Sequence, residues 1–320
     1  MPAGGIASRT ASLAAVTWQD GRVTTSRSGF ASLVGRPNAG KSTLTNALVG
    51  EKIAITSSRP QTTRHAVRGI LTRPDAQLVL VDTPGLHRPR TLLGERLNAV
   101  VRETWADVDV VALCLPANEP VGPGDRFLAR ELAGLAKPVL AVVTKTDLVE
   151  PPGVVAALAA VQRLGEQTGL ELAEIVPVSA VERFQVDLLA DLLIARLPEG
   201  PPLYPDNELT DEPTETRIAE LIREAALEGV REELPHSLAV SIDETSRRDD
   251  LTVIHATVHV ERDSQKPIVL GTGGARLRAV GTTARREIEA LLGGRVYLDL
   301  HINVLKDWQR DPRQLRRLGF

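Results

Sequence analysis

The feature that most constrains the fold is the glycine-rich segment GRPNAGKS at residues 35–42, which fits the pattern G-x-x-x-x-G-K-[ST]. It follows an apolar run at residues 30–34 and precedes a helix-forming stretch at residues 42–49. In that setting the glycines let the backbone curl so that its N–H groups and the helix N-terminus face phosphate groups. Lys41 is then placed to reach the β- and γ-phosphate oxygens, and the Ser42 hydroxyl to ligate Mg²⁺. The segment predicts a strand, loop and helix built around a nucleoside triphosphate.

Two further motifs belong to the metal side of the same site. DTPG, residues 82–85, follows the apolar run at residues 78–81, where a carboxylate on the metal side and a glycine that senses the γ-phosphate are expected. QTTR, residues 61–64, lies between the first two motifs in a polar stretch without core periodicity, as a mobile switch loop would. One of its threonines, Thr62 or Thr63, is expected to close on Mg²⁺, and Thr63 is our candidate.

A fourth motif reads the base. TKTD, residues 144–147, ends the apolar run at residues 139–143, at the edge of the sheet where open α/β folds bind ligands. The Asp147 carboxylate can accept the N1 and N2 hydrogens of guanine, whereas adenine offers an acceptor at N1 and has no 2-amino group. Ser179 and Ala180 close the next strand and are placed to offer a backbone N–H to the guanine O6. These residues favour a guanine nucleotide and disfavour an ATP-dependent kinase or ATPase.

The candidate residues of this site form three sets. The predicted nucleotide-binding residues are Gly35, Arg36, Pro37, Asn38, Ala39, Gly40, Lys41, Ser42, Thr43, Asp82, Thr83, Pro84, Gly85, Thr144, Lys145, Asp147, Ser179 and Ala180. The candidate Mg²⁺ ligands are Ser42, Thr63 and Asp82. The candidate catalytic residues are Asn38, Lys41, Thr63 and Gly85.

The alternation of elements sets the fold class of the first domain. A length of 320 residues suits about two domains. From residue 30 to 197, short apolar strands alternate with helical stretches, which indicates a mostly parallel α/β sheet with helices on both faces. Residues 197–206 place four prolines in ten positions, so we expect a Pro-rich linker at 198–212. The expected strands are residues 30–34, 65–71, 77–81, 108–115, 139–143 and 175–178.

The second domain, residues 213–320, is expected to be α+β. Its predicted order is a helix at 214–232, strands at 237–242 and 251–260, a glycine loop GTGG, a helix at 275–292 and a last strand at 295–304. A polar stretch at 243–250 should separate the first two strands. Charge divides unevenly here: residues 206–263 hold six Lys and Arg against sixteen Asp and Glu, while residues 264–320 hold eleven against five. The basic end can mark an anionic partner, although solvated faces of opposite charge would give the same count.

The first 29 residues and the cysteine content bound the remaining possibilities. Residues 1–29 are rich in Ala, Ser, Thr and Arg, carry one acid, and are expected to be a disordered extension, with an organelle transit peptide as the alternative. The one cysteine, Cys114, excludes an intramolecular disulfide partner and lies in an apolar run, so we expect it in the core. No apolar run approaches the roughly 18 residues that a spanning helix needs. A cytoplasmic protein fits these observations.

Taken together, the motifs and the second domain resemble the Era GTPase family. The resemblance runs from about residue 30 to 320 and rests on GRPNAGKS, QTTR, DTPG, TKTD, the Ser-Ala pair, the glycine loop and the ending from residue 308. It implies a P-loop GTPase domain followed by a type II KH domain, and hydrolysis of GTP to GDP with Mg²⁺. It also implies binding near the 3′ end of 16S rRNA, action in maturation of the 30S subunit, and peripheral membrane contact.

The KH resemblance predicts the RNA-binding residues. Small residues in a GXXG loop let backbone and nucleotide phosphates approach closely, beside an apolar groove for the bases. The basic helix that follows the loop favours this interpretation over an ordinary helix cap. Trp308 could stack a base, but a packing role is an equal alternative. The predicted RNA-binding residues are Gly271, Thr272, Gly273, Gly274, Arg276, Arg278, Arg285 and Arg286.

The sequence departs from the family pattern at two positions. Thr144 stands where the base motif usually begins with Asn, so the contact with guanine N7 or the bracing of the phosphate loop should be weaker. Gly273 stands where the family's loop often carries Lys, which removes one phosphate-directed charge.

The residue after Gly85 raises a separate question about the attacking water. Leu86 lies where Ras-like enzymes have the glutamine that orients this water, so water must be recruited otherwise. The resemblance suggests a K⁺ ion held by Asn38 and switch-loop carbonyls, and the alternative is that Asn38 only shapes the loop.

A second function class remains open at this point. In it the chain is a GTP-dependent signalling switch that acts at a membrane or a protein partner, and the KH-like domain is a docking surface. The arginines at residues 310–317 could touch anionic lipid, although no long amphipathic anchor is visible. Binding to rRNA and binding to liposomes would separate the two functions.

Overall fold

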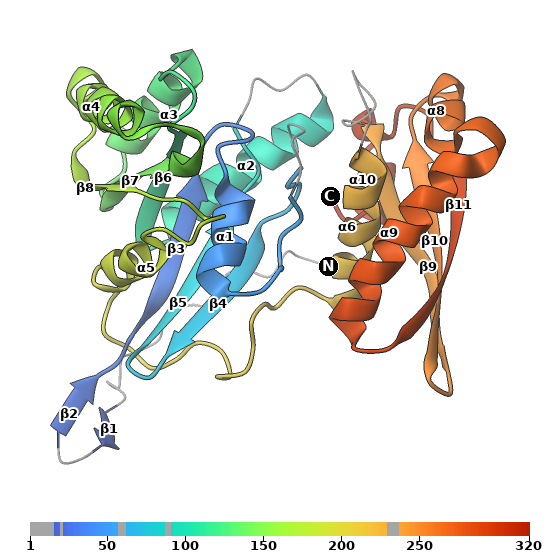
Figure 1. Cartoon of the computed structure of the whole chain (residues 1–320), viewed down its shortest axis with the longest axis horizontal. Helices are drawn as coiled ribbons and strands as arrows, with labels where there is room; N and C mark the ends of the chain where they lie inside the picture. The colour runs from blue at the N-terminus through green and yellow to red at the C-terminus, as the bar shows by residue number, and fades with distance from the viewer. Residues whose placement is uncertain (1–15, 20–21, 57–61, 87–90, 229–236) are drawn as a thin grey trace.

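The computed structural model describes residues 16–19, 22–56, 62–86, 91–228 and 237–320. They form an N-terminal α/β domain and a smaller C-terminal α+β domain, which lie side by side (Figure 1). The described residues 50–56 and 62–66, between α1 (Lys41–Val49) and β4 (Val67–Arg73), lie on the side of the N-terminal domain that faces the C-terminal domain.

The N-terminal domain is built on a six-stranded sheet with the order β4-β5-β3-β6-β7-β8. The neighbours from β5 to β8 are parallel, whereas β4 pairs antiparallel with β5. Strands β5, β6 and β7 are buried along their whole length, as a sheet covered on both faces requires. The alternation in the sequence therefore predicted this sheet correctly. Its strands are β3 (Arg27–Val34), β4 (Val67–Arg73), β5 (Ala76–Asp82), β6 (Val110–Pro116), β7 (Val139–Thr144) and β8 (Leu172–Pro177).

Helices cover both faces of this sheet. On one face α1 (Lys41–Val49) and α5 (Val186–Ile194) pack over a core that includes the buried Cys114, as predicted. A second core on the other face is covered by the helices α2 (Leu92–Asp107), α3 (Pro123–Ala133) and α4 (Pro151–Thr168). Because the strands are parallel, the loops that follow β3, β5 and β7 meet at one edge. The motifs GRPNAGKS, DTPG and TKTD lie on or beside these three loops, whereas the described part of QTTR precedes β4 and the Ser-Ala pair follows β8.

The predicted extension over residues 1–29 is wrong in its last part. Strand β3 begins at Arg27, whose backbone N–H donates to the Asp75 carbonyl at 3.0 Å. Ahead of it, β1 (Val16–Gln19) and β2 (Arg22–Thr25) form an antiparallel hairpin. The threonines and valines of this stretch favour a strand. Residues 1–15 and 20–21 lie outside the described residues.

The predicted linker is attached to the N-terminal domain along residues 200–209. The Gly200 N–H donates to the Ser26 carbonyl at 2.9 Å, and the Gln77 amide donates to the Tyr204 carbonyl at 2.9 Å. Further along, the Ile70 N–H on the edge strand β4 donates to Leu209 at 2.9 Å. The proline-rich composition excluded regular structure, but these hydrogen bonds fix the path of the chain.

The C-terminal domain has a three-stranded sheet in the order β11-β10-β9. β10 is parallel to β11 and antiparallel to β9, and the helices α6 and α9 share one apolar core with the sheet. The predicted order is confirmed, with two short helices, α8 and α10, added. The elements are α6 (Thr214–Leu227), β9 (Ala239–Arg248), β10 (Leu251–Val260), α8 (Lys266–Leu270), α9 (Ala275–Leu292), β11 (Arg295–Val304) and α10 (Pro312–Arg317).

Two boundaries of this domain differ from the prediction. The polar stretch at 243–250 was expected to be a loop, but β9 continues to Arg248 and turns at Asp249, whose φ is 53°. Polar cross-strand contacts support the extension: Thr257 donates to Asp243 at 2.6 Å. Helix α6 ends at Leu227, and residues 229–232 of the predicted helix lie outside the described residues.

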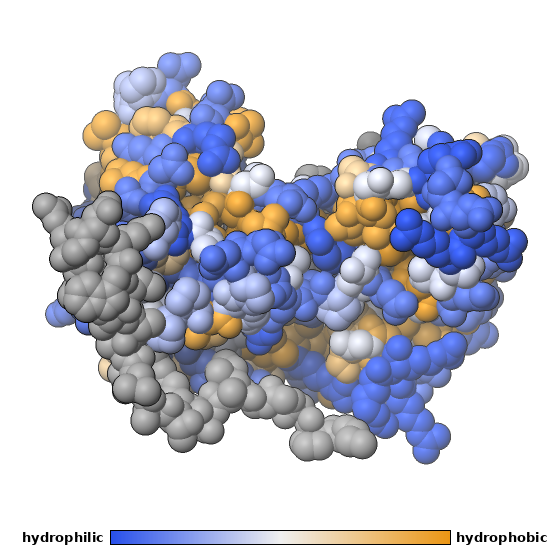
Figure 2. Space-filling view, turned by 90° about the horizontal axis from the view of Figure 1, so that it is seen from below, coloured by the Kyte–Doolittle hydropathy of each residue, from blue (hydrophilic) through white to orange (hydrophobic). Residues whose placement is uncertain are grey.

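Within the described part of the chain, no helix combines the length and the apolar character that crossing a membrane requires. On the face drawn in Figure 2, the surface of the C-terminal domain is mainly hydrophilic, with smaller hydrophobic areas between the polar groups.

Candidate nucleotide and RNA sites

The loop between β3 and α1 has the geometry of a phosphate cradle. Gly40 adopts φ 87°, in the left-handed region that favours glycine. At Gly35 a Cβ would lie 2.7 Å from the Cys114 carbonyl oxygen, so no larger residue fits. The Lys41 Nζ donates to the carbonyls of Gly35 at 3.0 Å and of Arg36 at 3.1 Å, which ties both ends of the loop together.

Lys41 is a buried cation. Its side chain is 6% exposed, and burial lowers the pKa of its ammonium group, against the opposing attraction of Asp82. Two neutral carbonyls and one carboxylate nearby are modest compensation for a desolvated charge. An anionic ligand such as a phosphate chain would complete the compensation.

Three oxygen-bearing side chains converge beside this loop. The Ser42 hydroxyl donates to Asp82 Oδ2 at 2.6 Å, and Thr63 Oγ1 lies 3.0 Å from Ser42 Oγ and 3.4 Å from Asp82 Oδ2. Of the two threonines, Thr63 is the one that makes these contacts. Burial raises the pKa of Asp82, while Lys41 and the two hydroxyls oppose the shift.

This cluster fits a small hard cation. The second oxygen of Asp82, Oδ1, is buried and has no hydrogen-bond partner among the described residues. A carboxylate and two hydroxyls are the oxygen donors that Mg²⁺ uses when it also bridges phosphates. Ser42, Thr63 and Asp82 would hold the ion.

The DTPG loop presses against the phosphate loop. Gly85 lies so close to Pro37 that an added Cβ would be 2.9 Å from the Pro37 nitrogen. Thr83 is buried and donates to the Leu33 carbonyl at 3.2 Å, which anchors the start of the loop to β3. Leu86 is buried in the core and presents no group that could orient water.

The base motif braces the phosphate loop directly. The Thr144 hydroxyl donates to the Ala39 carbonyl at 2.7 Å. Thr144 therefore supplies a bracing contact that we expected to be weak without asparagine. The Ser179 hydroxyl donates to Asp147 Oδ1 at 2.6 Å, which unites the two predicted base-reading motifs. The Ser179 N–H already donates to the Phe184 carbonyl at 3.2 Å, so it is not free for a contact with guanine O6 in this conformation.

A cavity of about 260 Å³ adjoins these loops. The side chain of Arg36 does not line it, because its guanidinium pairs with Asp125 at 2.7 Å and with Glu119 at 3.3 Å. Ile55, Thr56 and Glu119 line the cavity without having been predicted. The lining residues are Pro37, Asn38, Gly40, Lys41, Ser42, Thr43, Ile55, Thr56, Thr62, Thr63, Gly85, Glu119 and Lys145.

The second glycine loop is open to solvent. Gly271, Gly273 and Gly274 have φ values of 71°, 57° and 75°, so each needs the left-handed region. Thr272 and Gly273 are exposed, and a Cβ added at Gly273 would meet no atom within 4 Å. A nucleic-acid backbone can therefore reach this loop without displacing protein atoms.

The four predicted arginines separate into two kinds. Arg276 points back to helix α6, where it donates to the carbonyls of Ala226 and Glu228. Arg278 is exposed and donates to the Gly273 carbonyl at 2.8 Å. Two further exposed cations on α9 are Arg285 and Arg286. The structure thus assigns Arg276 a capping contact and leaves the other three accessible to an anionic partner.

The alternatives for Trp308 are resolved in favour of packing. Its side chain is fully buried, and Nε1 donates to the Ser237 carbonyl at 3.1 Å. The Arg64 guanidinium lies 5.7 Å from the centre of its ring. The Trp308 ring is therefore not available to stack an RNA base in this conformation.

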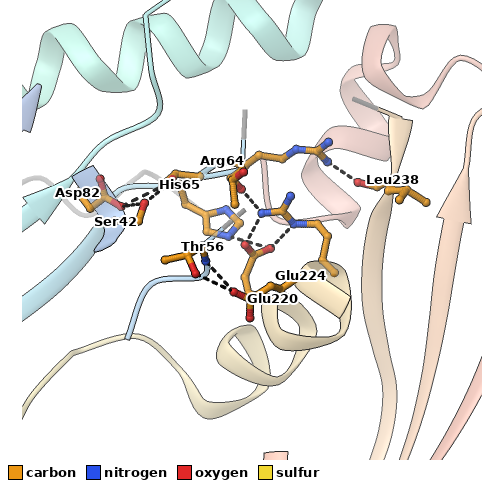
Figure 3. Close-up of polar contacts among 11 residues, drawn as sticks. Ser42, Thr56, Arg64, His65, Asp82, Glu220, Glu224 and Leu238 are labelled. Carbon is orange, nitrogen blue, oxygen red and sulfur yellow. Dashed lines mark hydrogen bonds and ion pairs between the residues drawn. The ribbon is translucent and has the colours of Figure 1, made fainter. Parts of the chain in front are cut away.

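Sequence reasoning missed the contact between the two domains. Residues 51–56 and 62–65 lie against helix α6, and Glu220 and Glu224 point from that helix toward His65 and Thr56 (Figure 3). The sequence predicted the helix at 214–232 but no partner for its acidic residues. The spacing of Glu220, Arg223 and Glu224, which share one helix face, was the available signal.

The comparisons with known proteins agree with this geometry. A family model described as a 50S ribosome-binding GTPase matches residues 30–145, and a KH domain model matches residues 233–309. GTPase Era of Streptomyces coelicolor is 66% identical over 304 residues, which cover 93% of this chain and 96% of that protein. GTPase Era of a Nocardioides species is 65% identical over 301 residues, with 92% of this chain and 96% of that protein covered.

Two solved structures are similar over nearly the whole chain. Era in complex with MgGDPNP and nucleotides 1506–1542 of 16S ribosomal RNA superposes with a TM-score of 0.87 at 36% identity, covering 92% of this chain and 99% of that one. An Aquifex aeolicus Era variant bound to GDP·AlF₄⁻ gives a TM-score of 0.86 with the same identity and coverage.

The fold and the site thus define a P-loop GTPase joined to a KH domain. The agreement of both domains, at these identities and over this share of the chain, identifies the family. The chain belongs to the Era family of GTPases, enzymes that hydrolyse GTP.

Proposed function

We propose that this GTPase is a ribosome assembly factor that binds 16S rRNA near its 3′ end and acts in maturation of the 30S subunit. The observation that carries the proposal is the exposed GTGG loop followed by three accessible arginines, Arg278, Arg285 and Arg286. An RNA backbone can approach such a loop closely, and the cations favour its phosphates. The related Era that was solved with nucleotides 1506–1542 of 16S rRNA supports the choice of RNA.

Nucleotide chemistry follows from the roles proposed for the first site. Lys41 and the phosphate loop hold the β- and γ-phosphates, Asp147 selects guanine, and Ser42, Thr63 and Asp82 hold Mg²⁺. When bound, Mg²⁺ neutralises charge on the phosphate oxygens. Gly85 lies beside the γ-phosphate, so that loss of this phosphate after hydrolysis releases the switch loops.

The attacking water needs a helper other than residue 86. Asn38 lines the cavity with φ 63°, and we propose that it holds a K⁺ ion there. Hydrolysis should then be faster in potassium than in sodium, with the difference lost in Asn38→Ala. Equal rates in both salts would remove this role for Asn38.

A gel shift tests the main proposal. The probe is an oligonucleotide that matches the 3′ end of 16S rRNA, with a shuffled oligonucleotide of the same length as control. Binding should be tighter with a non-hydrolysable GTP analogue than with GDP, since Thr62 of the predicted switch loop contacts Arg223 of the C-terminal domain. Equal affinity for both oligonucleotides would contradict the choice of RNA.

Peripheral contact with a membrane is the second candidate. The exposed arginines of helix α10, among them Arg313, Arg316 and Arg317, could meet anionic lipid. We place the protein in the cytoplasm, where its buried Cys114 would stay reduced. Sedimentation with anionic vesicles, with neutral vesicles as control, tests the contact. Salt-sensitive binding to anionic vesicles alone would support it.

A further inference from the structure

Helix α6 of the C-terminal domain makes a direct contact with the metal side of the nucleotide site. The Arg223 guanidinium donates through Nη2 to the backbone carbonyl of Thr62. That carbonyl belongs to the peptide bond whose nitrogen is Thr63, the residue that contacts both Ser42 and Asp82. The KH-domain arginine is therefore linked to Thr63, a proposed Mg²⁺ ligand, through one hydrogen bond and one peptide bond.

Arg223 is held in one orientation. Its side chain is 2% exposed, and Glu220 accepts hydrogen bonds from Nε at 2.8 Å and from Nη2 at 2.5 Å. Such a two-point pairing fixes the plane of the guanidinium. Because Glu220 and Arg223 sit three residues apart on α6, the helix itself sets where the Thr62 carbonyl is held.

The neighbouring contacts hold the same segment on both sides of Thr63. Thr56 donates its backbone N–H to Glu224 at 2.8 Å, and Arg64 donates to the Leu238 carbonyl at 2.5 Å. His65 lies 3.6 Å from Glu220. Figure 3 shows Thr56 and His65 between the Ser42–Asp82 pair and the glutamates of helix α6, with Leu238 on the far side beyond Arg64. The segment around Thr63 is thus positioned by side chains and carbonyls of the other domain.

The charge arrangement indicates a role in geometry rather than in stability. Arg64 and Arg223 are both buried, and their like charges repel each other. Nη1 of Arg223 is buried without a hydrogen-bond partner among the described residues. Burying two cations and an unpaired N–H donor costs free energy, so these groups are poor sources of interface stability.

We propose that Arg223 is a positioning residue for GTP hydrolysis, which holds the Thr62 carbonyl so that the Thr63 hydroxyl meets Mg²⁺. The inference rests on the proposed function, in which Thr63 ligates the ion. It makes the KH domain a structural part of the active GTPase, so that docking of α6 and assembly of the metal site occur together.

The test compares Arg223→Gln with Arg217→Gln in the full chain. Arg217 lies on the same helix and touches the same segment, at the Lys52 carbonyl and Glu51, but away from the metal side. In Arg223→Gln, kcat should fall and the Mg²⁺ concentration for half-maximal hydrolysis should rise, by about 10- to 100-fold, the range typical when a group that orients a metal ligand is lost. Affinity for GDP should stay within about twofold, because switch contacts with Mg²⁺ depend on the γ-phosphate. Arg217→Gln should change neither quantity.

A second variant controls for misfolding, since Arg223→Gln leaves the partly buried Glu220 carboxylate without its arginine partner. The double variant Arg223→Gln with Glu220→Gln removes both charges, and its thermal melting is measured alongside the parent. A parent-like Mg²⁺ dependence in a variant that melts with the parent would overturn the proposal.

Thr63→Ala distinguishes failure of the inference from failure of the site assignment. If Thr63→Ala slows hydrolysis while both Arg223 variants remain parent-like, Arg223 has no positioning role and the metal assignment stands. If Thr63→Ala itself hydrolyses GTP at the parent rate, the metal assignment fails, and the positioning role fails with it.

Discussion

The two glycine loops of this chain, both proposed to bind phosphate groups, have opposite surroundings. The loop at residues 35–42 is enclosed: Lys41 ties it from within, Thr144 braces it from β7, and Gly85 presses on it from the next strand. The GTGG loop is open to solvent. A Cβ added at Gly273 would have no neighbouring atom within 4 Å. An enclosed loop suits one short phosphate chain and its metal ion, whereas an open loop suits a polymer that must pass over it.

The largest effect is expected in the enclosed loop. Lys41→Ala removes the cation nearest the phosphates, so GTP binding and hydrolysis should fall by at least about 100-fold, the scale seen when a charge-stabilising group is lost. Folding should persist, because the buried ammonium is itself poorly compensated. Filter binding and phosphate release measure the effect, with Lys306→Ala, an exposed lysine of the other domain, as control. Unchanged turnover would contradict the assignment.

In the open loop, RNA binding should be lost when negative charge and larger side chains are introduced. Thr272→Asp combined with Gly273→Asp places two carboxylates where a phosphate strand would pass, so affinity for 16S RNA should drop by at least about tenfold, as expected when attractive backbone contacts become repulsive. GTP hydrolysis without RNA should stay within about twofold of the parent. Parent-like RNA binding by this variant would favour the protein-docking alternative.

Both glycine loops could be predicted from the sequence, because each is a local motif. A glycine-rich loop directly before a helix can be recognised within a few residues. The contact of α6 with the segment before β4 depends on residues about 160 apart, and an acidic helix face is the same in sequence whether it meets water or another domain. Arg276 illustrates this limit: its place beside the GTGG loop predicted RNA contact, yet it caps α6.

The sequence predicted neither the N-terminal hairpin nor the full length of β9, for a related reason. Polar residues at 243–248 look like a loop until their partners on β10 are known, since Thr257 and Asp243 satisfy each other across the strands. The bracing by Thr144 was underestimated because the family pattern was read for the missing amide, while the hydroxyl reaches the Ala39 carbonyl at 2.7 Å.

The proposed recognition of guanine by Asp147 is a further property of the enclosed site and should be independent of the open loop. Asp147→Asn replaces an acceptor pair by an amide, and xanthine presents an acceptor where guanine has its 2-amino group. Preference should move from GTP toward XTP by about 10- to 100-fold, the scale of a buried hydrogen bond to a charged group made or lost. Competition binding with both nucleotides measures it, with RNA affinity as the internal control. A variant that keeps the parent's preference would contradict the role of Asp147.

The smallest effect is expected where the open loop gains a charge. Gly273→Lys should tighten RNA binding a few-fold and steepen the log-log salt dependence by up to about one unit, since one more phosphate is neutralised. Residue 273 has φ 57°, so the new side chain strains the backbone and reduces the gain. Titrations at several salt concentrations measure the slope. An unchanged slope would mean that this position does not contact phosphate.

The most direct test of the central claim assays both loops in both damaged variants. GTP affinity and RNA affinity are measured in parallel for Lys41→Ala and for Thr272→Asp with Gly273→Asp, with RNA binding assayed in the absence of nucleotide. We expect a reciprocal pattern: the first variant loses GTP binding and keeps basal RNA binding, and the second loses RNA binding and keeps GTP binding. If the aspartate pair abolished GTP binding in a folded protein, or left RNA binding intact, the division of phosphate recognition between an enclosed and an open loop would be contradicted.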